Sequence, residues 1–132
     1  MSLDRQALGA AGERVAERWL RARGWCILAR RFRSGHRDVD LIARRERVVA
    51  FVEVKTRRGL DFGDPTEAVG WRKRRELTRS AQVWIDRCGE PGAVYRFDVV
   101  AVLVEARTAV RVRHVEDAFR VCAGGSDSGF AT

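Results

Sequence analysis

The sequence predicts a single α/β domain in which helices pack on a β-sheet. Apolar residues recur at helical spacing near the N-terminus and again after residue 64, and they alternate as in a β-hairpin between residues 38 and 55. A chain of 132 residues can bury one sizeable core but is too short for two domains. We therefore expect one domain over residues 1–122 and a disordered, Gly- and Ser-rich tail over residues 123–132.

The chain is strongly basic, with a formal net charge of +8. Such a charge attracts polyanions, and nucleic acid is the commonest polyanion of a cytoplasm. The alternative is a basic protein without such a partner. Only two of the 26 basic residues are lysines, Lys55 and Lys73, which suggests that a compact ammonium group matters at these two places. The three cysteines have no metal-ligand spacing and no stretch resembles a membrane span, which favours reduced thiols in a cytoplasmic protein.

Residues 3–23 form the first predicted helix, which is amphipathic and ends before Gly24. Gly9 and Gly12 weaken its helix propensity by roughly 1 kcal/mol each, so close approach to a neighbouring backbone is the expected reason for them. Glu13 lies at the edge of the apolar arc. Its side chain can lean inward to a metal ion or outward to an arginine of the same helix, and the sequence alone favours the outward orientation.

The apolar run at residues 25–29 predicts a first strand, and a basic segment over residues 30–37 follows it. Arginines in such a place suit a phosphate backbone that enters a site, since phosphate contacts position a nucleic acid without reading its sequence. A solvated loop is the alternative. The arginines of this segment are Arg30, Arg31, Arg33 and Arg37.

A β-hairpin is predicted from Asp38 to Lys55, with a basic turn at residues 44–47. Its second strand alternates apolar positions with a face that carries Glu53 and Lys55. This second face can therefore perform a polar task. The wholly apolar face must be buried and comprises Val48, Ala50, Val52 and Val54.

The register of the hairpin decides whether Asp40 joins the polar face. A turn centred on Arg45 and Glu46 places Asp40 opposite Phe51 and diagonal to Glu53, on the same face of the sheet. A turn of three residues would send Asp40 to the other face.

Two neighbouring carboxylates beside an apolar strand are costly to bury unless a positive group lies between them. Mg²⁺ takes such oxygen ligands, usually one or two carboxylates together with waters and phosphates. Lys55 could then meet a phosphate or the attacking water. The alternative is an ion pair of Lys55 with Glu53 or Asp40 on a solvated sheet face, and the sequence alone leaves the two interpretations about equally open.

A second helix is predicted to begin at Asp64, with Pro65 and Glu67 completing the start signal, and to run to about Cys88. Lys73 stands on its apolar stripe and should point toward the sheet and the hairpin. The alternative is a side chain whose stem packs while its ammonium group reaches water. Four neighbouring arginines should point outward: Arg72, Arg74, Arg75 and Arg79.

Residues 94–105 predict a further, inner strand because they are almost continuously apolar. Asp98 interrupts this strand and is expected to pair with Arg96. Residues 109–114 alternate as a final, half-exposed strand, and residues 115–122 predict a short closing helix.

Several motifs between residues 9 and 119 resemble one family. They are Gly9 with Gly12-Glu13, Asp40-Leu41-Ile42-Ala43, Phe51-Val52-Glu53-Val54-Lys55 with Arg57, Phe62-Gly63, Lys73, Arg96-Phe97-Asp98-Val99 and His114 through Ala118-Phe119. The pattern resembles the PD-(D/E)XK nuclease superfamily, also called restriction-endonuclease-like. More closely, it resembles the YraN-type family of small bacterial proteins, which are similar to archaeal Holliday junction resolvases. Where that family usually has Gly-Glu-Ile-Asp, this chain has Arg37-Asp38-Val39-Asp40.

The resemblance implies a restriction-endonuclease-like fold with a mixed central sheet that contains the antiparallel hairpin. It also implies a site for Mg²⁺ or Mn²⁺ formed by Asp40, Glu53 and Glu13. Lys55 would position or activate the attacking water, and Lys73 would be an auxiliary catalytic residue. The arginines expected to contact nucleic acid are Arg30, Arg31, Arg33, Arg37, Arg57, Arg58, Arg72, Arg74 and Arg75.

We therefore expect a metal-dependent endonuclease that hydrolyses phosphodiester bonds in DNA, including branched DNA of the Holliday-junction kind. One rival is a non-catalytic nucleic-acid-binding module that keeps the same fold, and another is a scaffold protein whose charge is incidental. A homodimer is expected by analogy, because a four-way junction offers two equivalent scissile sites.

Overall fold

The computed structural model describes residues 5–35, 37–59, 69–106 and 109–119. Its five strands form one sheet in the order β1-β2-β3-β4-β5, in which β3 and β4 run parallel and the other neighbours antiparallel. This mixed sheet with flanking helices confirms the predicted fold class. The elements are α1 (Arg5–Ala22), β1 (Cys26–Phe32), β2 (Val39–Arg45), β3 (Val48–Arg58), α2 (Trp71–Cys88), β4 (Val94–Val104) and β5 (Val110–Phe119).

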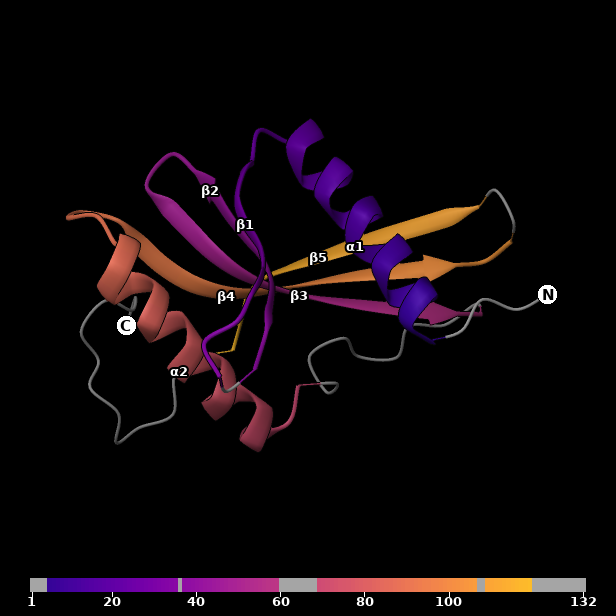
Figure 1. The fold of residues 1–132 in the computed structure, drawn as a ribbon. Coiled ribbons are helices and arrows are strands. Elements are labelled where there is room, and N and C mark those ends of the chain that lie inside the picture. Colours follow the sequence, from indigo (N-terminus) through magenta and orange to yellow (C-terminus); the bar gives the residue numbers. More distant parts are fainter. Residues whose placement is uncertain (1–4, 36, 60–68, 107–108, 120–132) are drawn as a thin grey trace.

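The two helices lie on opposite sides of the sheet (Figure 1). α1 buries Ala16 and Leu20 against one face, and α2 buries Leu77, Ala81 and Trp84 against the other. β3 lies between the two layers and is therefore covered on both sides. Its predicted apolar face lies beneath α1, with Ala50 and Val52 buried and Val48 and Val54 partly buried.

At Gly12, α1 lies very close to β3. A Cβ atom at this position would overlap Oγ1 of Thr56 and lie 2.9 Å from its Cβ. The expected close approach is confirmed for Gly12, although the neighbour is a side chain and not a backbone. For Gly9 the expectation is wrong, because no described atom lies within 4 Å of a Cβ placed there.

The β2–β3 hairpin turns at Glu46 and Arg47, one residue later than predicted. Its register pairs Phe51 with Ile42, so the predicted pairing of Phe51 with Asp40 is wrong. Glu46 adopts a left-handed φ of 55°, the conformation that a tight two-residue turn requires. Because the register moves by two residues, each side chain of the pair keeps its predicted face.

α2 begins at Trp71 and ends at Cys88, where its end was predicted. The predicted cap at Asp64 lies outside the described residues. Gly70 has an extended backbone, with φ −69° and ψ 169°, so a single helix from residue 64 to Cys88 is wrong.

β5 continues through Phe119, and the closing helix predicted from residue 115 is therefore wrong. Val115 pairs with Val99 of β4, and Phe119 pairs with Phe97. The two phenylalanine rings stack with their centroids 4.7 Å apart. Burial of this aromatic pair keeps the segment in the sheet. The remainder of the predicted helix and the predicted tail lie outside the described residues.

Asp98 of β4 is completely buried and pairs with Arg96, as predicted. Its carboxylate accepts hydrogen bonds from Nε and Nη2 of Arg96 at 2.9 and 3.1 Å. Nε2 of His114 lies 2.7 Å from Oδ2, and the backbone N–H of Asp117 donates to Oδ1 at 2.9 Å. This network joins β4 to β5 on the α1 side of the sheet.

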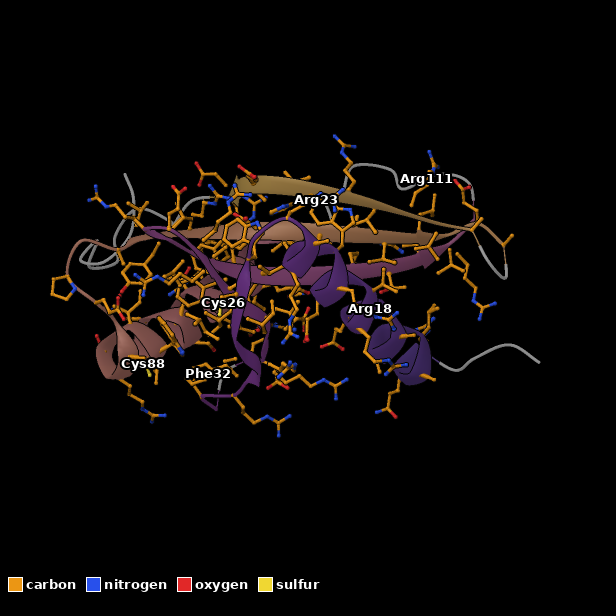
Figure 2. The ribbon with its side chains drawn as sticks, turned by 90° about the horizontal axis from the view of Figure 1, so that it is seen from above. Arg18, Arg23, Cys26, Phe32, Cys88 and Arg111 are labelled. Atoms are coloured by element: carbon orange, nitrogen blue, oxygen red, sulfur yellow. The ribbon has the colours of Figure 1, made fainter. Side chains whose placement is uncertain are left out.

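Two of the three cysteines lie in the described part of the chain. Cys26 at the start of β1 and Cys88 at the end of α2 are free, exposed thiols on separate elements (Figure 2). Neither of the two described helices combines the length and the apolar character that crossing a membrane requires.

Candidate active site

The candidate site lies where β2 and β3 separate. The last pair of their ladder is Leu41 with Val52, and one step further Asp40 and Glu53 face each other. Oδ2 of Asp40 accepts a hydrogen bond from the backbone N–H of Val54 at 2.8 Å. The Asp40 carboxylate thus takes the place that a backbone carbonyl of β2 would occupy if the ladder continued.

Asp40 and Glu53 line one cleft of about 610 Å³. The expectation that the two acids share one side of the hairpin is therefore confirmed. Glu53 is only 8% exposed, so its carboxylate needs a partner. The other residues that line the cleft are Arg33, Gly35, Arg37, Asp38 and Lys73.

Burial and the negative charge of Glu53 raise the pKa of Asp40 from its ordinary 3.8 to about 8. The hydrogen bond from the Val54 N–H acts in the opposite direction but is outweighed. At neutral pH Asp40 therefore keeps its proton unless a cation comes close to its own carboxylate. Such an arrangement is frequent at functional sites and attracts divalent cations.

Lys73 and Lys55, the two lysines of the chain, border this pair of acids. Lys73 comes from the first turn of α2, points toward the hairpin as its place on the apolar stripe predicts, and forms an ion pair with Glu53. Lys55 is half-buried on β3. Burial, followed by the positive charges of Lys73 and Arg57, lowers the pKa of Lys55. An ammonium group in this environment loses its proton more readily than an exposed lysine does.

Glu13 of α1 pairs with Arg31 of β1 and not with an arginine of its own helix, which the sequence favoured. Nη2 of Arg31 lies 3.0 Å from Oε2 of Glu13. Glu13 and Asp40 line a second, smaller cavity of about 250 Å³, and the charge of Glu13 further raises the pKa of Asp40. Within the described ranges no group of three or more His, Cys, Asp or Glu side chains is placed to hold a metal ion. Of the three predicted metal ligands, Asp40 and Glu53 thus lie together, whereas Glu13 lies nearby but is paired with Arg31.

The four arginines of residues 30–37, two in β1 and two after it, are all held by acids. Arg30 pairs with Glu17, Arg31 with Glu13, Arg33 with Asp38 and Arg37 with Glu76. Among these, Arg33 and Arg37 line the cleft. Ion pairing does not remove their donors, because a guanidinium group offers five N–H donors.

The arginines of β3 and α2 that were predicted to contact nucleic acid differ in their exposure and in their contacts. Arg74 does not point outward as predicted, because it donates to the carbonyl oxygen of Val69 at 2.8 Å and its guanidinium lies over the ring of Phe119. Arg57, Arg58, Arg72 and Arg75 are exposed, and none forms an ion pair within the described residues.

Ser80 is a site residue that sequence reasoning missed. It is completely buried on α2 and donates to the carbonyl oxygen of Arg37 at 2.7 Å. It also bonds to Oγ of Ser34 at 2.9 Å. These bonds fix the segment that carries Arg33 and Arg37 against α2. The available signal was a polar residue on an apolar helical stripe, which is also common in ordinary cores.

Comparison with known proteins finds relatives over most of the chain. The family described as "Uncharacterised protein family UPF0102" matches residues 12–102, which include both acids and both lysines. A UPF0102 protein of Nocardia farcinica is 47% identical over 116 residues, which cover 88% of this chain and 91% of that relative. A UPF0102 protein of Chloroherpeton thalassium is 43% identical over 121 residues, covering 86% of this chain and 94% of that relative.

Proposed function

This chain belongs to the uncharacterised protein family UPF0102, the YraN-type family that its motifs resemble, and we propose that it is a metal-dependent endonuclease acting on DNA. The observation that carries the proposal is the pair of Asp40 and Glu53 in a cleft that Lys73 also lines, with Lys55 within electrostatic reach of both acids. The strongly basic chain supports a polyanionic substrate.

The donor set fits a hard divalent cation. Asp40 and Glu53 face each other, but of these two acids Lys73 pairs only with Glu53, so Asp40, whose pKa is raised to about 8, is short of positive charge. Mg²⁺ and Mn²⁺ prefer oxygen ligands, and Mg²⁺ commonly takes one or two carboxylates and completes its shell with waters and phosphate oxygens. Asp40 and Glu53 would hold the ion, and Glu13 would join them only after releasing Arg31.

The side chains around the pair would then share the work of hydrolysis. A bound cation would supply Lewis acidity at the scissile phosphate. Lys73 would leave Glu53 and contact a phosphate oxygen instead. Lys55, whose pKa is lowered by burial, would orient the attacking water and, in its neutral amine form, would accept the proton of that water. Arg33 and Arg37 line the cleft and would position the backbone of the nucleic acid.

Substitution Glu53→Gln tests this function directly, because it keeps the shape of the side chain and removes a metal-binding charge. We expect cleavage of linear duplex and of a four-way junction, in Mg²⁺ or Mn²⁺, to fall by about 100-fold or more. A matched control is Glu90→Gln, which removes an exposed acid paired with Arg44. A Glu53→Gln protein that is folded and cleaves as fast as the wild type would end the proposal.

A second function is favoured by the engagement of Glu13 with Arg31, which leaves the acidic group with two members. In that case the chain would be a nucleic-acid-binding module without catalysis. Binding would depend strongly on salt and would be indifferent to the loss of Asp40, Glu53 or Lys55. The absence of cleavage with any divalent metal would further support this non-catalytic function.

The proposed substrate includes branched DNA, and the proposed assembly is a homodimer. A four-way junction offers two equivalent scissile sites, which a symmetric dimer can reach together. Light scattering of the protein with and without a junction measures this. A monomer in both conditions that cleaves duplex and junction equally well would exclude the junction-specific form of the proposal.

A further inference from the structure

Trp71, the first residue of α2, is the most exposed large apolar side chain of the described residues, at 62%. By contrast, Trp25 and Trp84 are 3% and 8% exposed. Leaving an aromatic side chain in water forgoes roughly 1.5–3 kcal/mol of burial free energy. An exposed indole of this kind is therefore informative when its surroundings suggest what could cover it.

The surroundings of Trp71 are cationic. The guanidinium of Arg75 lies 4.8 Å from the centroid of the indole ring. Helical periodicity places Arg72 and Arg79 on the same outward face, opposite the stripe that packs on the sheet. All three arginines are exposed, and in the described part of the chain none of them pairs with an acid.

This face lies next to the candidate site. Lys73, two residues after Trp71, reaches Glu53 from the inward side of the same turn. Trp71 and the acidic pair are thus separated by about one helix width, roughly 10–12 Å with side chains. A nucleic-acid strand with one phosphate in the cleft can therefore extend around the start of α2 to Trp71.

We propose that Trp71 and Arg75 form a stacking site for an unpaired base of the nucleic acid. Any base can stack on an indole, and a neighbouring guanidinium adds attraction to the base and the backbone. A base inside a duplex is already stacked on its neighbours and cannot use this platform. The inference rests on the proposed nucleic-acid substrate and specifies it as DNA with a single-stranded segment beside the cleavage point.

The test is binding without cleavage, in EDTA and at physiological salt. Fluorescence anisotropy would follow a labelled oligothymidine and a blunt duplex of the same length. Because stacking contributes about 1–3 kcal/mol per base, Trp71→Ala should weaken binding of the single strand by about fivefold or more. Binding of the duplex should change by less than about twofold, and Trp71→Phe should retain part of the affinity for the single strand. Leu28→Ala, which removes another exposed apolar side chain, is the matched control and should change neither.

Intrinsic fluorescence supplies a second readout. Oligothymidine should quench the tryptophan emission of the wild type, and Trp71→Phe should abolish the quenching, because the three remaining tryptophans are buried or half-buried. Equal weakening of single-strand and duplex binding, or unchanged single-strand binding, would overturn the inference. So would a change from dimer to monomer on Trp71→Ala, since the indole would then serve self-association.

These outcomes are independent of the proposed catalysis. Single-strand binding that needs Trp71 in a protein that never cleaves would support the stacking site and count against the nuclease. Cleavage that needs Glu53 together with single-strand binding indifferent to Trp71 would do the reverse.

Discussion

Asp98 and Asp40 lie in inner strands of the same sheet, yet their carboxylates are satisfied very differently. Asp98, on the α1 side, accepts bonds from Arg96 and the Asp117 backbone and contacts His114. Asp40, in the cleft, accepts a bond from the backbone N–H of Val54 and shares a hydrogen bond with a second acid, Glu53. Asp98 is completely buried and has a full set of donors, whereas Asp40 is partly buried, lines the cleft and lacks such a set.

The difference separates a structural carboxylate from a candidate catalytic one. A buried acid with every lone pair occupied fixes the elements around it and has no capacity for a ligand. An acid whose pKa is raised by burial and by a like charge is under strain that a cation can relieve. Burial of a carboxylate alone thus does not identify a functional site. Burial without a full set of hydrogen-bond donors or positive charges does.

The largest expected effect comes from removing the carboxylate of Asp98, whose hydrogen bonds are complete. Asp98→Ala leaves the cationic Arg96 and the ring of His114 without their buried acceptor. We expect the free energy of unfolding to fall by about 3–5 kcal/mol, measured by urea denaturation. Asp98→Asn should lose less, because one oxygen acceptor remains. A loss below about 1 kcal/mol for Asp98→Ala would mean that the network does not hold β4 to β5.

Gly12→Ala tests how tightly the α1 side is packed. The added methyl group would overlap Thr56, whose hydroxyl is buried and makes no hydrogen bond within the described residues. We expect a loss of about 2 kcal/mol in the free energy of unfolding, since overpacking forces α1 away from β3. The double variant Gly12→Ala with Thr56→Gly should recover much of that loss relative to Thr56→Gly alone, because it removes every Thr56 side-chain atom that the methyl group would meet. Non-recovery would place the strain elsewhere.

Asp40→Asn removes the carboxylate that lacks a full set of donors. It should raise the free energy of unfolding, whereas Asp98→Ala lowers it. The pKa of Asp40 is about 8 in the folded protein and near its ordinary 3.8 in the unfolded chain, so the folded state binds the extra proton. Wild-type stability therefore falls as the pH rises from about 4 to 8, and asparagine avoids this loss. We expect Asp40→Asn to be more stable by about 1–2 kcal/mol at pH 8, with a difference that vanishes near pH 4. Thermal unfolding across this range measures it, and a gap that is constant with pH would contradict the assignment.

Periodicity in the sequence was sufficient to predict the sheet, the faces of the hairpin and the direction of Lys73. These features depend on local alternation or on helical spacing, which neighbouring residues determine. The turn at Glu46 depended on one backbone conformation, and a shift of two residues left the faces unchanged. The polar side of the hairpin therefore could be predicted, although its exact pairing could not.

Long-range partners could not be predicted in the same way. Glu13 meets Arg31 across 18 positions of sequence, and no spacing rule selects this arginine among many. The first half of β5 was predicted as a strand, but its continuation from Val115 to Phe119 was mistaken for a helix, because burial against Phe97 overrides the local pattern. Tertiary contacts of this kind decide which predicted ligands come together.

The smallest expected effect concerns the other glycine of α1. A Cβ at Gly9 would meet no described atom within 4 Å, in contrast to the overlap at Gly12. Gly9→Ala should therefore stabilise the protein by about 0.5–1 kcal/mol, because alanine loses less backbone entropy than glycine on entering a helix. Urea denaturation beside Gly12→Ala gives a matched pair, one substitution per turn of the same helix. Opposite signs would show that contact with β3, and not helix propensity, sets the requirement for glycine at position 12, whereas a loss at both positions would contradict that explanation.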